Sequence, residues 1–324
     1  MRGRATGALP VPVVRSVEGR RAGARVRALK LVGALIKPVA FRGARTLTRL
    51  VARVFGQRGK AVLELSPGAL LEVDLTDAYW VKLLMPGYVY EPEVGPMLRR
   101  VLVEHQPDFI DCGANIGYWS VLASAWTDGA VSAVEASAGS FERLVMNAWL
   151  NKSRFRCIHA AVWSTDGESL LIETDRELGH SAAAVSAPGS SGTSAKHHES
   201  VTSASLDALC GLPTLDPERG LVIKLDVEGS EIAALHGAER TLHERDPLIV
   251  YEDHGADPSC RTSAFVLEEL GYSVYYCALA GSPVRLPDVD SVERVKKLAS
   301  RGYNFFACSS ASRFASMLEA RVDS

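Results

Sequence analysis

The side chains most able to do chemistry lie in one short stretch, Asp111-Cys112-Gly113-Ala114-Asn115-Ile116-Gly117. The apolar pair Phe109-Ile110 precedes it, and a helical pattern beginning at Tyr118 follows it. A buried strand, a glycine turn and a helix start in this order form a nucleotide-sized pocket, because glycine lets the backbone approach a ligand and the helix N-terminus offers free N–H groups. We therefore expect the main ligand of the chain at this turn.

The glycine spacing of the turn narrows the class of ligand. A dinucleotide fingerprint requires glycine at positions 115 and 118, where this chain has Asn115 and Tyr118. A Walker loop requires Gly-Lys followed by Ser or Thr, which this stretch does not contain. The remaining pattern, an acid followed by Gly113-x-Asn115-x-Gly117, is the form found in enzymes that use S-adenosylmethionine (SAM), a ligand with an amino-acid head and no pyrophosphate.

Each polar residue of the turn has an expected role. We expect Asp111 to order the turn by accepting its N–H groups and to meet the SAM ammonium group through water. Asn115 suits a position that needs a left-handed backbone, and its amide can serve the methionine part of SAM; a purely structural role in the turn stays open. Cys112 is interpreted as a small apolar filler.

Further ligand contacts are predicted at the ends of the next strands, because ligands of open α/β sheets bind beyond the carboxyl ends of the strands. Glu135 ends a predicted strand, where its carboxylate can accept both ribose hydroxyls of SAM. Ala161 and Val162 follow the third strand, and we expect them to admit the adenine by shape and by main-chain hydrogen bonds. His159 is interpreted as an ordinary strand-end histidine.

A lysine, Lys224, stands in the apolar run of the fourth predicted strand and needs a partner if it is buried. Asp226 or Glu228 can provide that partner. The fifth strand brings Glu252 and His254 to the same edge of the sheet. Asp226, Glu252 and His254 are therefore expected to converge on a bound acceptor.

The stretch from about Tyr90 to Glu252 resembles the FkbM family of SAM-dependent methyltransferases. The resemblance covers about half of the chain and rests on an ordered set of motifs, which are Tyr90-Glu91, Asp111-x-Gly113-Ala114-Asn115-x-Gly117, Glu135 followed by a helix with Asn147 and Asn151, Ala161-Val162, Ser205-Leu206-Asp207, Lys224-x-Asp226-Val227-Glu228-Gly229-x-Glu231 and Leu235-x-Gly237-Ala238. The chain departs from the family at Ala136-Ser137, where the family commonly has proline.

The resemblance implies a class I (Rossmann-like) methyltransferase fold with SAM as cofactor. It also implies methylation of a hydroxyl on a small molecule, a polyketide, a sugar or a glycan. Tyr90, Glu91, Ala136 and Asp226 are also counted among the expected SAM-binding residues.

Methyl transfer from a sulfonium is an in-line displacement, so the main task of the protein is to hold oxygen, methyl carbon and sulfur collinear. An alcohol must also lose its proton, and a base contributes about 10²- to 10⁴-fold. We assign the base to His254 or Asp226, and we expect Glu228 to orient Lys224 or the acceptor.

A divalent metal is the competing device for activating the hydroxyl. Asp226 together with Glu252 or Asp253 could hold Mg²⁺ at the ends of the fourth and fifth strands. We favour the metal-free arrangement, because three acids at strand ends are common without an ion.

Strand and helix patterns alternate along the chain and predict an α/β fold with a doubly wound, mostly parallel sheet of about seven strands. The predicted strands are 108–111, 130–135, 155–158, 221–226, 248–252, 272–277 and 303–308, with helices at 116–126, 139–150, 229–243, 259–270 and 290–299. The last strand is expected to be antiparallel and to lie at or near the edge of the sheet.

We divide the chain into three segments. Residues 1–58 form a basic amphipathic N-terminal extension, and residues 59–106 form a cap or lid with a β-hairpin and helices. Residues 107–324 form the methyltransferase domain. Within it, 186–200 is rich in Ser and Gly, and this composition predicts a flexible loop.

The N-terminal extension differs sharply in charge from the remainder. Up to Arg58 the chain has fourteen basic residues against one acid, Glu18, a net charge of +13, so the formal net charge of −2 leaves −15 for the rest. In residues 42–58, apolar side chains follow one helical face and arginines follow another. This helix can pack on the catalytic domain, lie on an anionic membrane surface or contact an acidic partner.

The composition also limits the compartment. Six cysteines show no C-x-x-C pair, so a reducing, cytoplasmic location is expected, with peripheral membrane contact through 42–58 as an addition. No segment reads as membrane-spanning or as a signal peptide. The acidic charge of the catalytic part argues against nucleic acid as a substrate.

Two alternatives accompany the O-methyltransferase interpretation. A non-catalytic SAM- or glycan-binding protein could be recruited by the basic helix. A nucleotide-dependent oxidoreductase would share the strand, turn and ribose acid, but not the glycines that a pyrophosphate requires. The apolar faces of the N-terminal helices also make a homodimer an expected arrangement.

Overall fold

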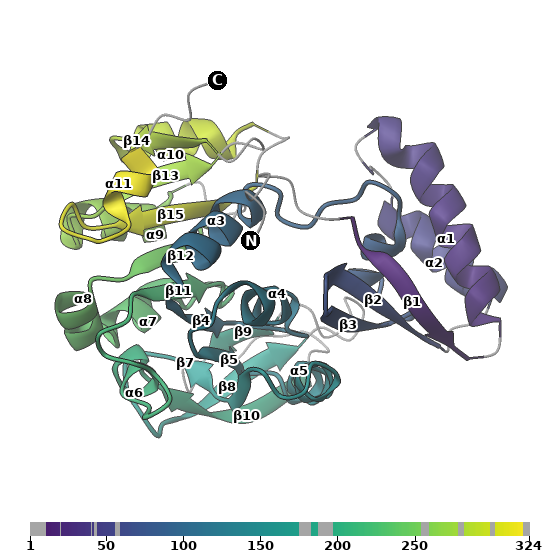
Figure 1. Cartoon of the computed structure of the whole chain (residues 1–324), viewed down its shortest axis with the longest axis horizontal. Coiled ribbons are helices and arrows are strands. Elements are labelled where there is room, and N and C mark those ends of the chain that lie inside the picture. Colours follow the sequence, from purple (N-terminus) through teal and green to yellow (C-terminus); the bar gives the residue numbers. More distant parts are fainter. Residues whose placement is uncertain are drawn as a thin grey trace.

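A large, mostly parallel sheet organises most of the molecule in the computed structural model (Figure 1). The structure describes residues 11–19, 21–39, 41, 44–55, 59–174, 183–186, 197–253, 259–277, 282–298 and 302–319. In spatial order the eight strands are β14 (Pro283–Leu286), β13 (Ser273–Cys277), β15 (Asn304–Cys308), β12 (Leu248–Glu252), β11 (Leu221–Leu225), β4 (Asp108–Cys112), β5 (Val131–Glu135) and β6 (Arg156–His159). The predicted α/β class and mostly parallel sheet are confirmed.

The antiparallel direction predicted for the last strand is confirmed, and the strand lies near the edge of the sheet, third in the order, rather than at the edge itself. β15 lies between β12 and β13 and is antiparallel to both. All five of its residues are buried, as expected for an apolar strand that is covered on both faces. The edge position belongs instead to β14, an antiparallel partner of β13 that the sequence pattern did not predict.

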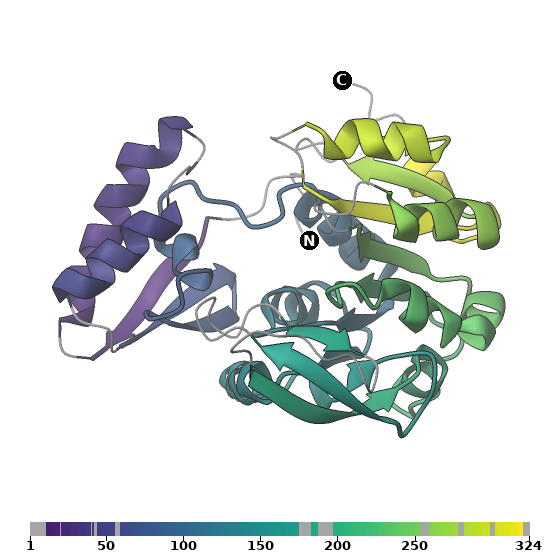
Figure 2. The ribbon, with the colours of Figure 1, turned by 180° about the vertical axis from the view of Figure 1, so that it is seen from behind.

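Helices cover both faces of the large sheet (Figures 1 and 2). One face shares a hydrophobic cluster with α3 (Gly95–His105), α4 (Tyr118–Trp126), α5 (Ala138–Leu150) and α11 (Ala315–Glu319). The other face packs on α6 (Leu206–Cys210), α7 (Glu231–His236), α8 (Glu239–Arg245), α9 (Arg261–Ala264) with the π-helical turn Phe265–Glu269, and α10 (Val289–Lys296). The arrangement is doubly wound, as predicted.

The segment 229–243, predicted as one helix, is divided into α7 and α8 at Gly237. A Cβ atom at Gly237 would lie 2.3 Å from the carbonyl oxygen of Trp163, so only glycine allows this close approach. The backbone N–H of Asp207 donates to the Gly237 carbonyl at 2.8 Å. The carboxylate of Asp207 accepts from the N–H groups of Arg240 and Thr241 at the start of α8. Two of the motifs used for the family resemblance therefore hold each other in place.

A second sheet covers part of the segment predicted as a loop. Its order is β7 (Ala161–Val162), β10 (His197–Ala204), β8 (Ser169–Thr174) and β9 (Ala183–Ser186). Ser186 ends β9 and 197–200 begin β10, so both ends of the predicted loop 186–200 are strand, and 187–196 lie outside the described residues. In β10, buried Val201 and Ser203 alternate with exposed Ser200 and Thr202, and pairing with β8 outweighs the polar composition here.

The N-terminal part of the chain forms a third sheet with two helices, which we call the N-terminal unit. Its elements are β1 (Val13–Glu18), α1 (Ala22–Ile36), a 3₁₀ turn at Lys37–Val39, α2 (Ala44–Phe55), β2 (Lys60–Ser66), β3 (Ala69–Asp74) and the 3₁₀ turn η2 (Trp80–Leu84). β1 pairs with β2, so the predicted extension and the predicted cap share one sheet. Among the described helices, none is both long enough and apolar enough to cross a membrane.

Two asparagines, one in α5 and one directly after it, attach the N-terminal unit to the large domain. Asn147 accepts the N–H of Glu72 at 2.7 Å and donates to the carbonyl of Ile116 at 2.8 Å. Asn151 accepts the N–H of Leu70 at 2.9 Å and donates to its carbonyl at 2.6 Å. Each side-chain amide takes the place of a neighbouring strand along the edge of β3. The N-terminal unit is therefore docked through specific hydrogen bonds next to the glycine turn.

Replacing Asn147 by alanine is expected to lower the free energy of unfolding by about 2–4 kcal/mol, because the substitution leaves a backbone donor and a backbone acceptor buried without partners. Denaturant unfolding measures this loss. Glu142→Ala, an exposed change on the same helix, should stay within about 0.5 kcal/mol. Equal stability of the two variants would contradict a docking role for Asn147.

Candidate active site

The glycine turn between β4 and α4 has the left-handed backbone that its sequence suggested. The φ angles are +77° at Gly113, +52° at Asn115 and +89° at Gly117. A Cβ atom at Gly113 would lie 1.7 Å from the carbonyl oxygen of Asp226, so this glycine lets the turn touch the end of β11. The left-handed conformation predicted for Asn115 is confirmed.

The N–H groups of the turn are taken by β5 rather than by Asp111. Val134 O accepts from Gly113 N and Ala114 N, each at 2.9 Å, and Glu135 Oε2 accepts from Asn115 N at 2.8 Å. Asp111 accepts instead from the hydroxyl of Ser120 at 2.5 Å and from its backbone N–H. The expectation that Asp111 orders the turn is wrong, because its buried carboxylate lies at the first turn of α4 and satisfies a free N–H group there.

Glu135 connects the turn to the beginning of α5. Its Oε1 accepts from Ser137 N at 2.8 Å, so each carboxylate oxygen holds one backbone N–H. Burial raises the pKa of Glu135 to about 7, although the N–H groups of Ser137 and Asn115 lower it. The side chain is 7% exposed and a carboxylate accepts about four hydrogen bonds, so acceptor positions are left for a ligand. The buried hydroxyl of Ser137 also has no partner among the described residues. These donors and acceptors fit a ribose diol.

A group of aromatic side chains, the aromatic cluster, adjoins the turn. Its members are Tyr79, Trp80, Tyr90, Tyr118 and Trp119, with neighbouring ring centroids 4.9–6.2 Å apart. The indole N–H of Trp80 donates to the side-chain oxygen of Asn115 at 3.0 Å.

No sequence motif surrounds Trp80, so its place beside the turn was not predicted. The adjacent pair Tyr79-Trp80 after the predicted hairpin was the only available signal. Only the docking of the N-terminal unit brings this segment to the turn.

Lys224 is 2% exposed and has two acidic partners. Its Nζ lies 2.7 Å from Asp226 Oδ2 and 3.8 Å from Glu91 Oε2. Burial opposes the charge, but Asp226, Glu91 and Asp111 together raise the pKa of Lys224, so it stays protonated. Glu91 also accepts from the indole of Trp119 at 2.7 Å. Of the two partners predicted for Lys224, the structure selects Asp226, and Glu91 joins it.

Three acids gather at the ends of β11 and β12. Burial, followed by the charge of Asp226 and a hydrogen bond to it, raises the pKa of Glu252 well above its usual range. Glu228 is half-buried with φ +51°, and burial followed by the charge of Asp226 raises its pKa to about 7. Glu231 Oε1 accepts from Val227 N at 3.2 Å and Gly229 N at 3.1 Å, which holds the turn that carries Glu228.

The residues predicted near the adenine, and the predicted base His254, lie in separate parts of the chain. Ala161 and Val162 are buried in β7, where they pair with Ser203 and Ala204 of β10. The carbonyl of Ala136 lies 3.0 Å from the His159 ring. His254 lies outside the described residues.

Asp253 was predicted as a possible metal ligand together with Asp226, but its carboxylate bonds to other residues. It pairs with Lys296 at 2.7 Å and accepts from Ser263 N at 2.9 Å. Within the described parts of the chain, no group of three or more metal-ligating side chains is assembled.

Replacing Glu252 by glutamine is expected to stabilise the fold at pH 7 by roughly 1–3 kcal/mol. In the folded state the Glu252 carboxyl keeps a proton that the unfolded chain releases above about pH 4.5. The free energy of unfolding therefore falls as pH rises from about 4.5 toward the raised pKa of the folded state. A neutral amide at this position removes that pH-dependent loss of stability. The stability advantage of the variant over wild type should therefore vanish at low pH, where the glutamate is protonated in both states. Thermal unfolding across pH, with the exposed Glu268→Gln as control, measures it. A pH-independent difference would contradict the protonated state of Glu252.

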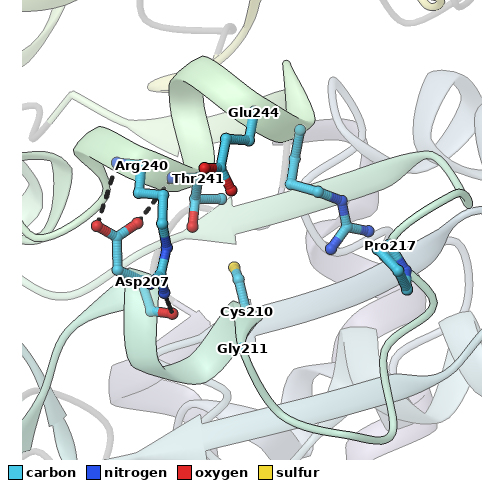
Figure 3. Close-up of a pocket in the computed structure, with 8 residues that line it drawn as sticks. Asp207, Cys210, Gly211, Pro217, Arg240, Thr241 and Glu244 are labelled. Atoms are coloured by element: carbon cyan, nitrogen blue, oxygen red, sulfur yellow. Dashed lines mark hydrogen bonds between the residues drawn. The ribbon is translucent and has the colours of Figure 1, made fainter.

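A cavity of about 430 Å³ lies away from this site, between α6 and α8 (Figure 3). Its lining includes Pro217 and Arg245, which precede β11 and β12, so the cavity is at the amino ends of these strands. Figure 3 shows Asp207 already bonded to Arg240 and Thr241. We therefore place the active site at the opposite edge, beside the glycine turn.

The doubly wound sheet with one antiparallel strand inside it, and the glycine turn after β4, define a class I methyltransferase fold. The family model described as "Methyltransferase FkbM domain" matches residues 111–274. The chain belongs to the FkbM methyltransferase family.

Solved structures give a weaker likeness. Methyltransferase FkbM from Methylobacillus flagellatus is 17% identical with a TM-score of 0.35; the match covers 63% of this chain and 44% of that one. Precorrin-6y C5,15-methyltransferase from Geobacter metallireducens is 13% identical, with a TM-score of 0.35 and coverage of 68% and 91%. TYW2 from P. horikoshii, solved with MeSAdo, is 13% identical, with a TM-score of 0.38 and coverage of 84% and 82%. No curated protein matches the chain.

Proposed function

We propose that this methyltransferase is a SAM-dependent O-methyltransferase that acts on a hydroxyl of a small molecule, a sugar or a glycan. The proposal rests on one observation, which is that the expected SAM-binding residues and a group of acids lie at the same edge of the large sheet. There the glycine turn and Glu135 lie beside the acids Asp226, Glu228 and Glu252.

Glu135, Asn115 and the glycine turn are the residues that would hold SAM. When bound, SAM supplies an electrophilic methyl group on a sulfonium. Glu135 would accept from the ribose hydroxyls, with the Ser137 hydroxyl beside it. The aromatic cluster would exclude water from this side of the turn, and the Trp80 indole holds the Asn115 side chain.

Among the described acids, Glu228 suits the base best. Its pKa of about 7 is close to the pH at which a general base works well, and it is half-buried rather than enclosed. Asp226 is neutralised by Lys224 at 2.7 Å, which weakens it as a base. Glu252 keeps its proton and so serves as a donor. His254 stays a sequence-based prediction.

The charge of the edge supports a neutral hydroxyl as acceptor. Asp226, Glu91 and Glu228 face one lysine, so a carboxylate or phosphate acceptor would be repelled. A neutral polyol can donate to the same acids. We also propose a cytoplasmic location, because all six cysteines are within the described residues and none of them forms a disulfide.

Calorimetric titration with SAM and, separately, with NAD tests the donor. Labelled SAM with panels of sugars, polyketides and glycan extracts then tests the acceptor. We expect SAM to bind, NAD not to bind, and label to enter a hydroxyl-bearing product. Failure to bind SAM overturns the proposal, and SAM binding without transfer to any hydroxyl favours a non-catalytic binding protein.

A further inference from the structure

The two helices of the N-terminal unit carry an exposed face that combines apolar and basic side chains. On α1, Leu31 and Leu35 are 68% and 78% exposed, opposite the face buried by Leu29 and Gly33. On α2, Leu50 and Val54 are 55% and 62% exposed. Lone exposed leucines are ordinary, but here two helices that pack on each other each expose a pair of apolar side chains at four-residue spacing.

The structure changes the sequence-based expectation for α2. Val51 and Thr48 are buried, so part of its apolar stripe packs on the protein. Leu50 and Val54 are left exposed, and α2 packs beside α1. Both views place α1 and α2 at the outer end of the molecule, remote from the large sheet (Figures 1 and 2).

Basic side chains surround these apolar pairs. Arg27 and Lys30 are exposed on α1, and Arg53 is exposed on α2. The sequence contains no acidic residue from Gly19 to Leu63, so no carboxylate of these helices offsets the positive charge. A bilayer with anionic headgroups has the complementary chemistry, because it accepts leucines at the acyl boundary and attracts Lys and Arg.

We propose that α1 and α2 form a docking face for an anionic phospholipid surface. The helices would lie in the interface plane, with Leu31, Leu35, Leu50 and Val54 inserted and Lys30 and Arg53 at the headgroups. This inference is independent of the O-methylation proposal.

Cosedimentation of the full-length protein with vesicles tests the proposal. We expect binding to phosphatidylcholine vesicles that contain about a third phosphatidylglycerol, little binding to pure phosphatidylcholine, and weakening by salt. Lys30→Gln with Arg53→Gln should weaken partitioning roughly 30-fold, since each basic residue contributes about fivefold. Leu35→Ser with Leu50→Ser should weaken it roughly tenfold or more.

Matched changes on an exposed face elsewhere provide the control. Val284→Ser with Arg285→Gln, both exposed on β14, should bind vesicles as wild type. Unfolding temperature establishes that each variant is folded. Absence of binding to anionic vesicles overturns the proposal, as does equal loss in the control variant. A dimer that the Leu35→Ser, Leu50→Ser variant dissociates, without vesicle binding, would assign the face to a second copy of the chain and also overturn it.

Discussion

Glu228→Gln is expected to reduce turnover by about 10²- to 10⁴-fold while SAM binding is kept. Glutamine preserves the size of the side chain and removes its capacity to accept a proton from the hydroxyl. The turn that carries Glu228 is held by Glu231 through the N–H groups of Val227 and Gly229, so the substitution leaves the local backbone supported. Single-turnover kinetics with labelled SAM, together with calorimetry of SAM binding, separate the two effects.

The pH profile gives a second readout for the same residue. Because the pKa of Glu228 is raised to about 7, its carboxylate forms as pH rises, and wild-type kcat/KM should increase through that region and then level off. The glutamine variant should lack this limb. Glu142→Gln, exposed on α5, should keep the profile of the wild type. An unchanged rate and an unchanged limb in Glu228→Gln would transfer the role of base to Asp226 or His254.

Glu135→Ala is expected to raise the dissociation constant for SAM roughly 100-fold. Two hydrogen bonds from ribose hydroxyls to a carboxylate contribute about 1.5 kcal/mol each at the lower end of the range for charged acceptors. The same change also removes the acceptors for Asn115 N and Ser137 N, so part of the loss reflects the turn itself. Isothermal titration calorimetry measures the affinity.

Two further variants resolve the origin of that loss. Glu135→Gln keeps one acceptor oxygen for a backbone N–H and should lose less affinity than Glu135→Ala. Ser137→Ala removes a hydroxyl that has no partner among the described residues, so it should leave the unfolding temperature nearly unchanged. Wild-type SAM affinity in Glu135→Ala would remove this carboxylate from the ribose site.

Local sequence rules predicted the parts of the site that lie within single turns. The left-handed position of Asn115 and the placement of Glu135 at a strand end follow from residue type and spacing, because a short segment alone decides its allowed backbone angles. The fold class followed for the same reason, since strand and helix periodicities are local properties.

Only the tertiary structure shows which side chains from distant segments hydrogen-bond to each other. Asp111 was expected to hold the turn, but Val134 and Glu135 reach those N–H groups, and Asp111 is left to Ser120. Trp80 meets Asn115 because the N-terminal unit docks on the large domain, where Asn147 and Asn151 bond to β3 and apolar side chains of both parts share one cluster.

The position of β15 and the exposure of the N-terminal leucines also separate what a local sequence pattern predicts from what tertiary packing decides. An apolar strand is recognisable from its residues, but whether it lies at an edge or inside the sheet depends on which strands come to flank it. An amphipathic helix is likewise recognisable from its period, whereas the side chains it buries depend on the neighbour against which it packs. The sequence by itself determined the class of fold, the glycine turn and the acids at the strand ends. Tertiary packing decided which of those groups pair, because burial and hydrogen bonding are properties of segments brought together by the whole chain.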